Sequence, residues 1–248
     1  MQQFDTVVVS DLHLGAHNAR ADDFLRFLDS IRTSRLILNG DIFDSDQVRR
    51  LRPDHLEVLD ALRSFASVAD VVWLQGNHDP EPAWSSTVFG IAFQREIVID
   101  SGDKQYLVCH GHEWDASMHW PAWMIRGADN IYYASQWIDP THKLARSLKR
   151  RCKRFCKAVK NLQHSAMNEA RRRDLDGVIL GHTHIGQDII EGGIHYLNCG
   201  CWTEKPSSFV GIRDGVARRI LWNADHDRIT VPPPPMRFEH EPSGTAVA

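Results

Sequence analysis

The chain has 248 residues, of which 42% are hydrophobic and 25% charged, and its formal net charge is −3. This balance predicts one folded domain with a sizeable core and an insertion, and no apolar run is long enough to cross a membrane as a helix. Five cysteines, an odd number, and no signal-type segment before the first strand predict reduced thiols and a cytoplasmic location.

Strands and helices alternate in the first third of the chain. Short β-branched or aliphatic runs predict buried strands, and apolar residues repeating every three to four positions predict amphipathic helices. In chain order we expect a strand at Val7–Val9, a helix at Asp22–Ile31, a strand at Leu36–Asn39, a helix at Pro53–Phe65 and a strand at Val71–Leu74. This order is typical of a mostly parallel sheet covered by helices, so the predicted fold class is α/β.

Later strands extend the prediction to residue 231. A hairpin is expected where Ser101-Gly102-Asp103-Lys104 separates two apolar runs, and further strands are expected at 177–180, 188–190, 195–197, 209–212, 216–221 and 228–231. We therefore predict one domain over 1–231 with a helical insertion at about 114–173. The tail at 232–248 opens with four prolines and is expected to be disordered or to lie along the surface.

Polar side chains follow five of these strands at the point where each strand ends. Asp11 and His13 come first, and in an extended segment two such residues point the same way. Since the carboxyl ends of strands in an open α/β sheet meet along one crevice, the side chains should converge. The seven candidate metal ligands are Asp11, His13, Asp41, Asn77, His110, His182 and His184.

Seven ligands exceed what one tetrahedral ion needs, and they suit two divalent ions that share a carboxylate. Asp41 is the predicted bridge. A mixed set of His, Asp and Asn ligands favours manganese first, with iron, zinc or cobalt as alternatives, over an oxygen-only magnesium or calcium site. Any one of these histidines read alone could be a surface or core residue.

Five short motifs resemble, in order, the blocks of the calcineurin-like metallophosphoesterase superfamily. They are Asp11-Leu12-His13, Gly40-Asp41, Gly76-Asn77-His78-Asp79, His110-Gly111-His112 and Gly181-His182-Thr183-His184. The resemblance implies a four-layer α/β/β/α sandwich. It also assigns one ion to Asp11, His13, Asp41 and His184, and the other to Asp41, Asn77, His110 and His182.

The resemblance further implies two catalytic residues, His78 and Asp79. His78 would face the scissile phosphate and Asp79 would orient it, whereas the alternative for His78 is a structural hydrogen bond to Asp79. In this chemistry two metals clamp a phosphoryl group, and a metal-bridging hydroxide attacks the phosphorus. His78 would stabilise the developing charge or protonate the leaving oxygen. His112 is expected either to contact substrate or to support a ligand.

The insertion is aromatic at first and then strongly basic. Residues 114–138 hold four of the eight tryptophans, and residues 141–173 hold twelve Lys and Arg against one acid. Such an insertion resembles the helical lid of the UDP-2,3-diacylglucosamine pyrophosphatase group, although His78 and His112 stand where that group's best-characterised members have Arg and Asp. The basic residues that we expect to bind substrate are Arg150, Arg151, Lys153, Arg154 and Lys157. The alternative is that the charges face solvent and an apolar stripe, with residues three or four apart, packs on the sandwich. The stripe consists of Leu144, Leu148, Cys152, Phe155, Val159, Leu162 and Ala166.

The predicted function is hydrolysis of a phosphoric ester or diphosphate, with a phosphate-containing substrate such as UDP-2,3-diacylglucosamine and peripheral contact with the inner membrane through the insertion. The alternative is a phosphodiesterase or phosphatase acting on a soluble nucleotide or phosphoprotein. A non-catalytic scaffold ranks lower because it would have no use for a complete two-metal site. A nucleic-acid-binding protein also ranks lower but stays an alternative, since the basic helix alone cannot distinguish one phosphate from another. The sequence does not indicate an oligomeric state.

Overall fold

The computed structural model describes residues 1–45, 47–80, 90–115 and 153–238. By its internal contacts the chain divides into two compact units, one formed by Met1–His110 with Glu169–Ala248 and the other by Gly111–Asn168. The predicted insertion at about 114–173 overlaps the second unit. Among the described residues, no helix is long and apolar enough to cross a membrane.

A seven-stranded sheet, ordered β12-β11-β10-β1-β2-β3-β4, forms the centre of the first unit. Strands β1, β2, β3 and β4 run parallel, and β10 joins β1 antiparallel. The strand bounds are β1 Gln2–Val9, β2 Ile31–Asn39, β3 Asp70–Leu74, β4 Ala92–Gln94, β10 Ser207–Arg213, β11 Val216–Asn223 and β12 Arg228–Thr230. The predicted parallel arrangement is confirmed, while β4 was not predicted and β2 begins five residues before the predicted strand.

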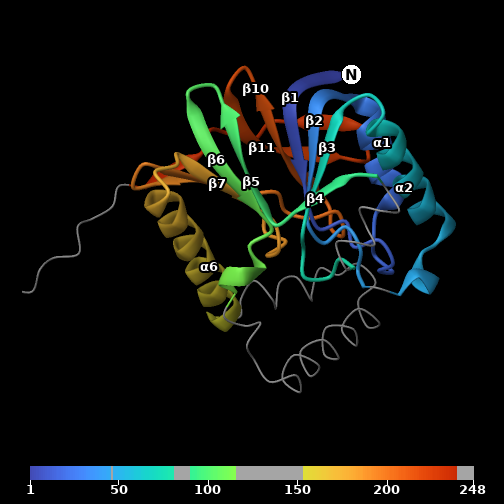
Figure 1. Ribbon diagram of the computed structural model, residues 1–248, viewed down its shortest axis with the longest axis horizontal. Helices are drawn as coiled ribbons and strands as arrows, with labels where there is room; N and C mark the ends of the chain where they lie inside the picture. The colour runs from blue at the N-terminus through green and yellow to red at the C-terminus, as the bar shows by residue number, and fades with distance from the viewer. Residues whose placement is uncertain (46, 81–89, 116–152, 239–248) are drawn as a thin grey trace, which may run out of the picture. The chain divides into compact units, whose positions relative to one another are not determined.

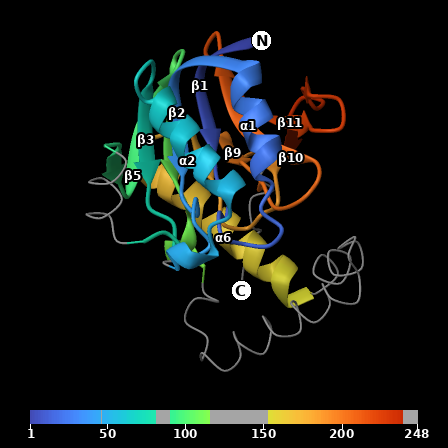
Figure 2. The same cartoon turned by 90° about the vertical axis from the view of Figure 1, so that its right-hand side faces the viewer.

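Two helices, α1 (Ala21–Ser30) and α2 (Pro53–Phe65), cover one face of this sheet. Figure 2 shows both of them crossing in front of β1, β2 and β3. Helix α2 begins at Pro53, whose fixed φ and missing N–H suit the first turn. Leu56, three residues before Leu59, is 53% exposed and lies off the apolar face of the helix. Val58 lies on that face, because at 3.6 residues per turn it is grouped with Leu59 and Leu62.

A six-stranded sheet, ordered β13-β8-β9-β7-β6-β5, packs on the other face of the first sheet (Figure 1). Its strands are β5 Glu96–Ser101, β6 Lys104–Cys109, β7 Gly177–Leu180, β8 Gln187–Glu191, β9 Ile194–Asn198 and β13 Met236–Phe238. A buried apolar cluster that includes Val8, Ile37, Val108 and Ile179 fills the space between the two sheets. The predicted hairpin is confirmed, since β5 and β6 pair antiparallel around Ser101–Lys104.

The start of the proline-rich tail departs from the prediction. Met236–Phe238 form β13, which pairs parallel with β8 through Met236 and Ile189. The carbonyls of Pro232 and Pro233 accept hydrogen bonds from Arg218 Nη2, and these bonds guide the chain to the sheet edge. Proline lacks only the N–H, so a run of prolines can still be anchored through its carbonyl groups.

Two short 3₁₀ helices, η1 (Val48–Arg50) and η2 (His112–Trp114), and one long helix complete the described elements. The long helix α6 covers Lys153–Arg172 and contains the second half of the predicted apolar stripe, in which Val159, Leu162 and Ala166 are buried. The first half of the stripe and the tryptophan-rich segment lie outside the described residues. Within the first unit, Arg173 pairs with Glu96 of β5, and Arg171 donates to the Glu191 carbonyl of β8.

Candidate metal centre

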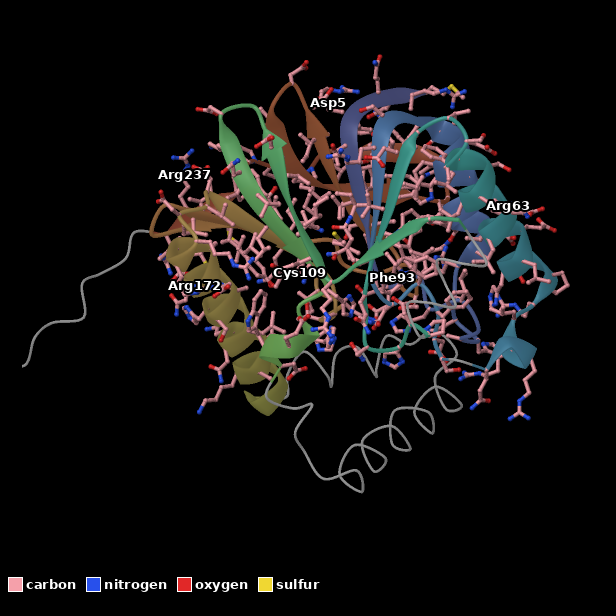
Figure 3. The ribbon with its side chains drawn as sticks, viewed as in Figure 1. Asp5, Arg63, Phe93, Cys109, Arg172 and Arg237 are labelled. Carbon is pink, nitrogen blue, oxygen red and sulfur yellow. The ribbon has the colours of Figure 1, made fainter. Side chains whose placement is uncertain are left out.

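The predicted ligands lie at the carboxyl ends of the strands, as expected. Asp11, Asp41 and Asn77 follow β1, β2 and β3, while His110 and His182 follow β6 and β7. In Figure 3, Asp5 of β1 lies at one end of the sheets, and Cys109, the residue before His110, lies toward the other end. The two sheets therefore bring five strand ends together at one edge.

The chain reaches this edge through strained backbone. Five of the seven predicted ligands, namely Asp11, His13, Asp41, His182 and His184, have φ between +49° and +64°. Residues other than glycine rarely adopt this left-handed backbone conformation, and each instance costs about 1 kcal/mol or more. The strand β1 ends at Val9, so Asp11 and His13 are not in the extended conformation that the sequence argument assumed. They still converge, because the backbone curls left-handed after the strand.

Backbone hydrogen bonds between neighbouring strand ends hold these turns. The amide of Asp11 donates to the Gly40 carbonyl over 3.0 Å, and the amide of His13 donates to the Asp41 carbonyl over 3.0 Å. Asp11 Oδ2 accepts from the His182 amide at 3.0 Å, and Asp41 Oδ1 accepts from the His78 amide at 2.9 Å. Each carboxylate thus has one oxygen fixed by a neighbouring turn.

The donor atoms of six predicted ligands form two clusters, and a further group joins His13 to Asp44 and His78. In the first, His184 Nε2 lies 3.1 Å from Asp11 Oδ1 and 3.1 Å from His13 Nε2. In the second, which joins Asp41, His110 and His182, His110 Nε2 lies 3.2 Å from Asp41 Oδ2. Asp41 Oδ2 is also 3.7 Å from His13 Nε2, so this carboxylate lies between the two clusters. Asp11, His13 and His184 thus lie together, as do Asp41, His110 and His182, and the Asp41 carboxylate lies between the two clusters.

These residues fit two divalent ions. Two ligands bonded to one ion at about 2.1 Å lie roughly 3.0–3.4 Å apart, which matches the closest separations above. Asn77 Oδ1 is buried and accepts no hydrogen bond, although a buried amide oxygen normally has a partner. His110 Nδ1 lies 2.9 Å from the Asn39 carbonyl, and donation there leaves Nε2 with the lone pair that a ligand needs.

The buried aspartates and histidines of the centre favour each other's charged forms. Burial by itself lowers the pKa of both His13 and His110, but the carboxylates around them, chiefly Asp11 for His13 and Asp41 for His110, raise the pKa of each to about 10. Burial raises the pKa of Asp11, but the charge of His184 and contact with His13 hold it well below its usual value. For Asp41, burial is likewise outweighed, here by His110, and its pKa is lowered.

The metal-free protein is therefore expected to lose stability as the pH rises. In the unfolded chain the histidines have a pKa of about 6.5, so their contribution is complete below about pH 6.5 and is lost as pH approaches 10. Urea unfolding after chelation should show a lower midpoint at pH 9.5 than at pH 7. Loading with metal, which requires neutral imidazoles, should remove most of this dependence. Equal midpoints in the chelated protein would contradict the prediction.

Asp79 has a different role from the one predicted. Its Oδ1 accepts from the amides of Ile42 and Phe43, and its Oδ2 accepts from the amides of Asp41 and Gly76 and from Trp73 Nε1, at 2.8–3.3 Å. Asp79 therefore ties the turn after β2 to the turn after β3. Its position next to His78 in the sequence suggested an orienting contact, but its carboxylate accepts hydrogen bonds from backbone amides and from Trp73 Nε1.

His78 is exposed and close to the first cluster. Its ring centroid lies 5.1 Å from that of His13, and its Nδ1 lies 2.9 Å from the backbone carbonyl of Asp44. Asp44, which lies three residues after Asp41 in the same turn, was not among the predicted site residues. The sequence feature that points to Asp44 is a second acidic residue three positions after Asp41.

The remaining predicted residues belong to the second unit. His112 begins η2, and its Nδ1 lies 3.8 Å from a Glu113 carboxylate oxygen. Lys157 is exposed on α6, and Lys153 and Arg154 are in the first turn of that helix. Arg150 and Arg151 lie outside the described residues. Substrate binding by these five basic side chains and by His112 stays a prediction.

Close backbone approach explains two glycines of the motifs. A Cβ at Gly76 would lie 2.1 Å from the Asp41 amide nitrogen and 2.2 Å from Asp41 Oδ1, and a Cβ at Gly40 would lie 2.6 Å from His110 Nδ1. Real side chains never tolerate such distances, so a substitution must move the ligand itself. Both glycines are therefore required by the metal ligands beside them.

Gly76→Ala is expected to reduce metal content and stability together, because the added methyl group displaces Asp41. The measurement is metal stoichiometry by elemental analysis combined with the thermal unfolding midpoint. Gly193→Ala is the control for metal content: a Cβ there meets nothing within 4 Å, and any loss of stability comes from its own φ of +82°, a strain that Gly76 does not share. If both variants retained metal equally, the close approach would not constrain the site.

Comparison with known proteins agrees with this geometry. The family model for calcineurin-like phosphoesterases matches residues 4–186, whereas no curated protein sequence matches the chain. Among solved structures, similar chains include a single mutant of Vps29 from Entamoeba histolytica, with 19% identity, a TM-score of 0.51 and coverage of 91% of this chain and 96% of that one.

Two further structures show the same likeness. YfcE, a phosphoesterase from E. coli, has 16% identity, a TM-score of 0.52 and coverage of 90% of this chain and 95% of that one. Vps29 from Chaetomium thermophilum has 14% identity, a TM-score of 0.50 and coverage of 92% and 93%. At these identities the likeness concerns the fold, and it confirms the predicted fold class. Since the family model spans most of the sequence, the chain belongs to the calcineurin-like phosphoesterase family.

Proposed function

We propose that this chain is a two-metal hydrolase of phosphoric esters or diphosphates. The observation that carries the proposal is the position of Asp41 Oδ2, 3.7 Å from His13 Nε2 and 3.2 Å from His110 Nε2, between two clusters of ligand atoms. A pair of divalent ions held there would clamp a phosphoryl group and lower the pKa of a shared water. Manganese is the ion we propose first, because the donors mix imidazole, carboxylate and amide.

The chain's own groups supply the remaining chemistry. Asn77 offers a buried amide oxygen with no hydrogen-bond partner, ready to act as a ligand. His78 is held through Nδ1 at the Asp44 carbonyl, so the imidazolium form carries its second proton on Nε2. That proton can be transferred to the oxygen of the leaving group or can stabilise charge on the phosphoryl oxygens.

His78→Ala is expected to keep both metals and to lower kcat by on the order of 10²–10⁴, the usual contribution of a positioned general acid. Steady-state kinetics with Mn²⁺, together with metal analysis of the same preparation, test this. His226→Ala, which removes an exposed histidine of the turn before β12, is the control. Unchanged kcat in His78→Ala would assign His78 a purely structural role.

The substrate is the open part of the proposal. UDP-2,3-diacylglucosamine remains one candidate, supported by the aromatic and basic composition of residues 114–173. A soluble nucleotide or phosphoprotein is the other. Metal-reconstituted protein should be assayed with UDP-2,3-diacylglucosamine, bis-p-nitrophenyl phosphate, p-nitrophenyl phosphate and single-stranded DNA. Cleavage of none of them in the presence of Mn²⁺ would contradict the hydrolase proposal and favour a non-catalytic scaffold.

A deletion within the insertion separates the two substrate classes. If residues 115–170 bind acyl chains or an anionic membrane surface, replacing them with a short linker should remove turnover of the lipid substrate and spare turnover of bis-p-nitrophenyl phosphate. Equal retention of both activities would exclude a lid role for the insertion.

A further inference from the structure

The start of helix α2 reaches the segment that follows the ligand His13. His55 is fully buried, and its Nδ1 accepts hydrogen bonds from the Gly15 amide at 3.0 Å and from the Arg52 amide at 3.3 Å. The bond from Arg52 belongs to the helix itself, because a side chain at the third helical position often caps the amide before the helix. The bond from Gly15 leaves the helix and comes from a residue only two positions after His13.

Arg52, the residue before α2, holds the same segment through its guanidinium group. Its Nη1 and Nη2 atoms donate at 3.1–3.3 Å to three backbone carbonyls, those of Ala16, His17 and Ala19. Its Nε and Nη2 also donate to the carboxylate of Asp54, which orients the planar group from within the helix. Apart from bonds within this helix start, the hydrogen bonds of Arg52 and His55 therefore all go to residues 15–19.

This segment begins in strained backbone. His13 has φ of +49°, and Gly15 has φ of +106°. A left-handed conformation at a residue with a side chain persists only where the surrounding structure holds it. The Ala16 amide donates to the His13 carbonyl at 2.9 Å, so contacts that fix residues 15–19 also fix the carbonyl side of His13.

We propose that His55, together with Arg52, is a positioning residue of the metal centre. By holding residues 15–19, the two side chains keep His13 in the left-handed conformation that presents its Nε2 to the first cluster. That nitrogen lies 3.1 Å from His184 Nε2 and 3.7 Å from Asp11 Oδ1. If the segment relaxed, the ligand nitrogen would move away from both.

The two bonds to Nδ1 also fix the protonation state of His55. A ring nitrogen that accepts N–H groups carries no proton, so the proton is on Nε2, which is buried and has no hydrogen-bond partner. Burial, followed by the charge of Arg52, lowers the pKa of His55 despite the Asp54 carboxylate 3.9 Å from Nε2. An apolar side chain would avoid the unpaired N–H, so the acceptor nitrogen is what the histidine contributes.

The effect is expected on one ion only. Residues 15–19 continue from His13, which belongs to the first cluster. His110 and His182 of the second cluster follow β6 and β7 instead, and neither turn is bonded to Arg52 or His55. Loss of His55 should therefore weaken the ion held by Asp11, His13 and His184.

The inference rests on the proposed two-metal function, but its test measures metal binding and needs no substrate. Metal-free wild type, His55→Leu and His55→Asn should be titrated with Co²⁺, following the visible spectrum and the heat of binding. Wild type should bind two ions, and His184→Ala, which removes a ligand of the first cluster alone, identifies the step of that cluster. His55→Leu should weaken this step by about 10–100-fold and leave the other unchanged. His55→Asn, whose Oδ1 takes the position of Nδ1, should bind as wild type does.

Two matched controls separate positioning from general stability. His195 of β9 is also buried, and its ring nitrogens lie 2.9 Å from Tyr106 Oη and from Asp188 Oδ1. His195→Leu should lower the urea unfolding midpoint and leave both Co²⁺ steps unchanged. Arg52→Gln should weaken the first-cluster step, whereas Arg35→Gln, which replaces an arginine of the same 40% side-chain exposure, should not.

The inference is wrong if His55→Leu binds both ions as wild type does, or if His195→Leu weakens the first-cluster step equally. A loss in His55→Asn as large as that in His55→Leu would also overturn it, because the acceptor would then be irrelevant. If His55→Leu does not fold, Arg52→Gln decides in its place, and unchanged binding there overturns the inference.

The outcomes for the inference and for the proposed function are distinct. Hydrolysis by wild type with unaltered Co²⁺ binding in the variants would contradict the role of His55 alone. Loss of the first-cluster step in the variants, without any hydrolysis by wild type, would support that role and contradict the hydrolase.

Discussion

Asp41→Ala is expected to abolish binding of both metal ions and all hydrolytic activity. The carboxylate lies between the two ligand clusters, so its removal takes one ligand from each ion at once. It also removes the chief cause of the raised pKa of His110 and a lesser cause of the raised pKa of His13. Loss of a single peripheral ligand would affect mainly one ion, whereas loss of the shared ligand affects both.

The measurement is metal stoichiometry by elemental analysis after reconstitution with Mn²⁺, followed by steady-state assay. Asp70→Ala is the control, because it also removes a carboxylate but from an exposed pair at the start of β3. A variant that kept one tightly bound ion would show that Asp41 belongs to one cluster only, and the two-ion geometry would then be incorrect.

Asp79→Ala is expected to destabilise the folded protein strongly, by at least about 3 kcal/mol. The carboxylate accepts hydrogen bonds from four backbone amides and from Trp73 Nε1, and a buried donor left without a partner costs about 1–3 kcal/mol. Because those amides belong to the turns that carry Asp41 and Asn77, metal affinity should fall as well.

Urea unfolding of the metal-free protein isolates the stability effect from metal binding. Asp79→Asn should be intermediate, since its amide keeps one accepting oxygen. Asp100→Ala, at an exposed position in β5, should change the unfolding midpoint little. If Asp79→Ala had the same urea unfolding midpoint as wild type and lost only activity, Asp79 would return to a catalytic role beside His78.

The order of the strand ends could be predicted from sequence because it depends on local patterns. Apolar runs such as Val7–Val9 and Val71–Leu74 define strands, and parallel strands bring their carboxyl ends to one edge. The residues that follow them then have to be neighbours, whatever the details of the turns. This is why Asp11, Asp41 and Asn77 could be placed together before any distance was known, whereas His110 follows β6 of the second sheet and its place rested on the motif resemblance.

The contacts of Asp79 could not be predicted in the same way. Asp79 bonds to amides of residues 41–43, some 36 to 38 positions away, and this contact depends on the register that pairs Asn39 of β2 with Leu74 of β3. Adjacency in sequence favoured His78 as the partner of Asp79. In three dimensions a turn from another strand is closer, and its three backbone amides donate to the Asp79 carboxylate.

By itself, the sequence determined the chemical character of the site, its seven candidate ligands and their order along the sheet, because residue type and strand periodicity are local properties. Only the tertiary structure decided how those ligands converge, with Asp11 and His13 in left-handed backbone rather than extended. It alone decided that Asp79 joins two turns and that Asp44, paired with Arg50, lies near Nδ1 of His13. These arrangements follow from packing and hydrogen bonds between distant strand ends, which no local pattern encodes.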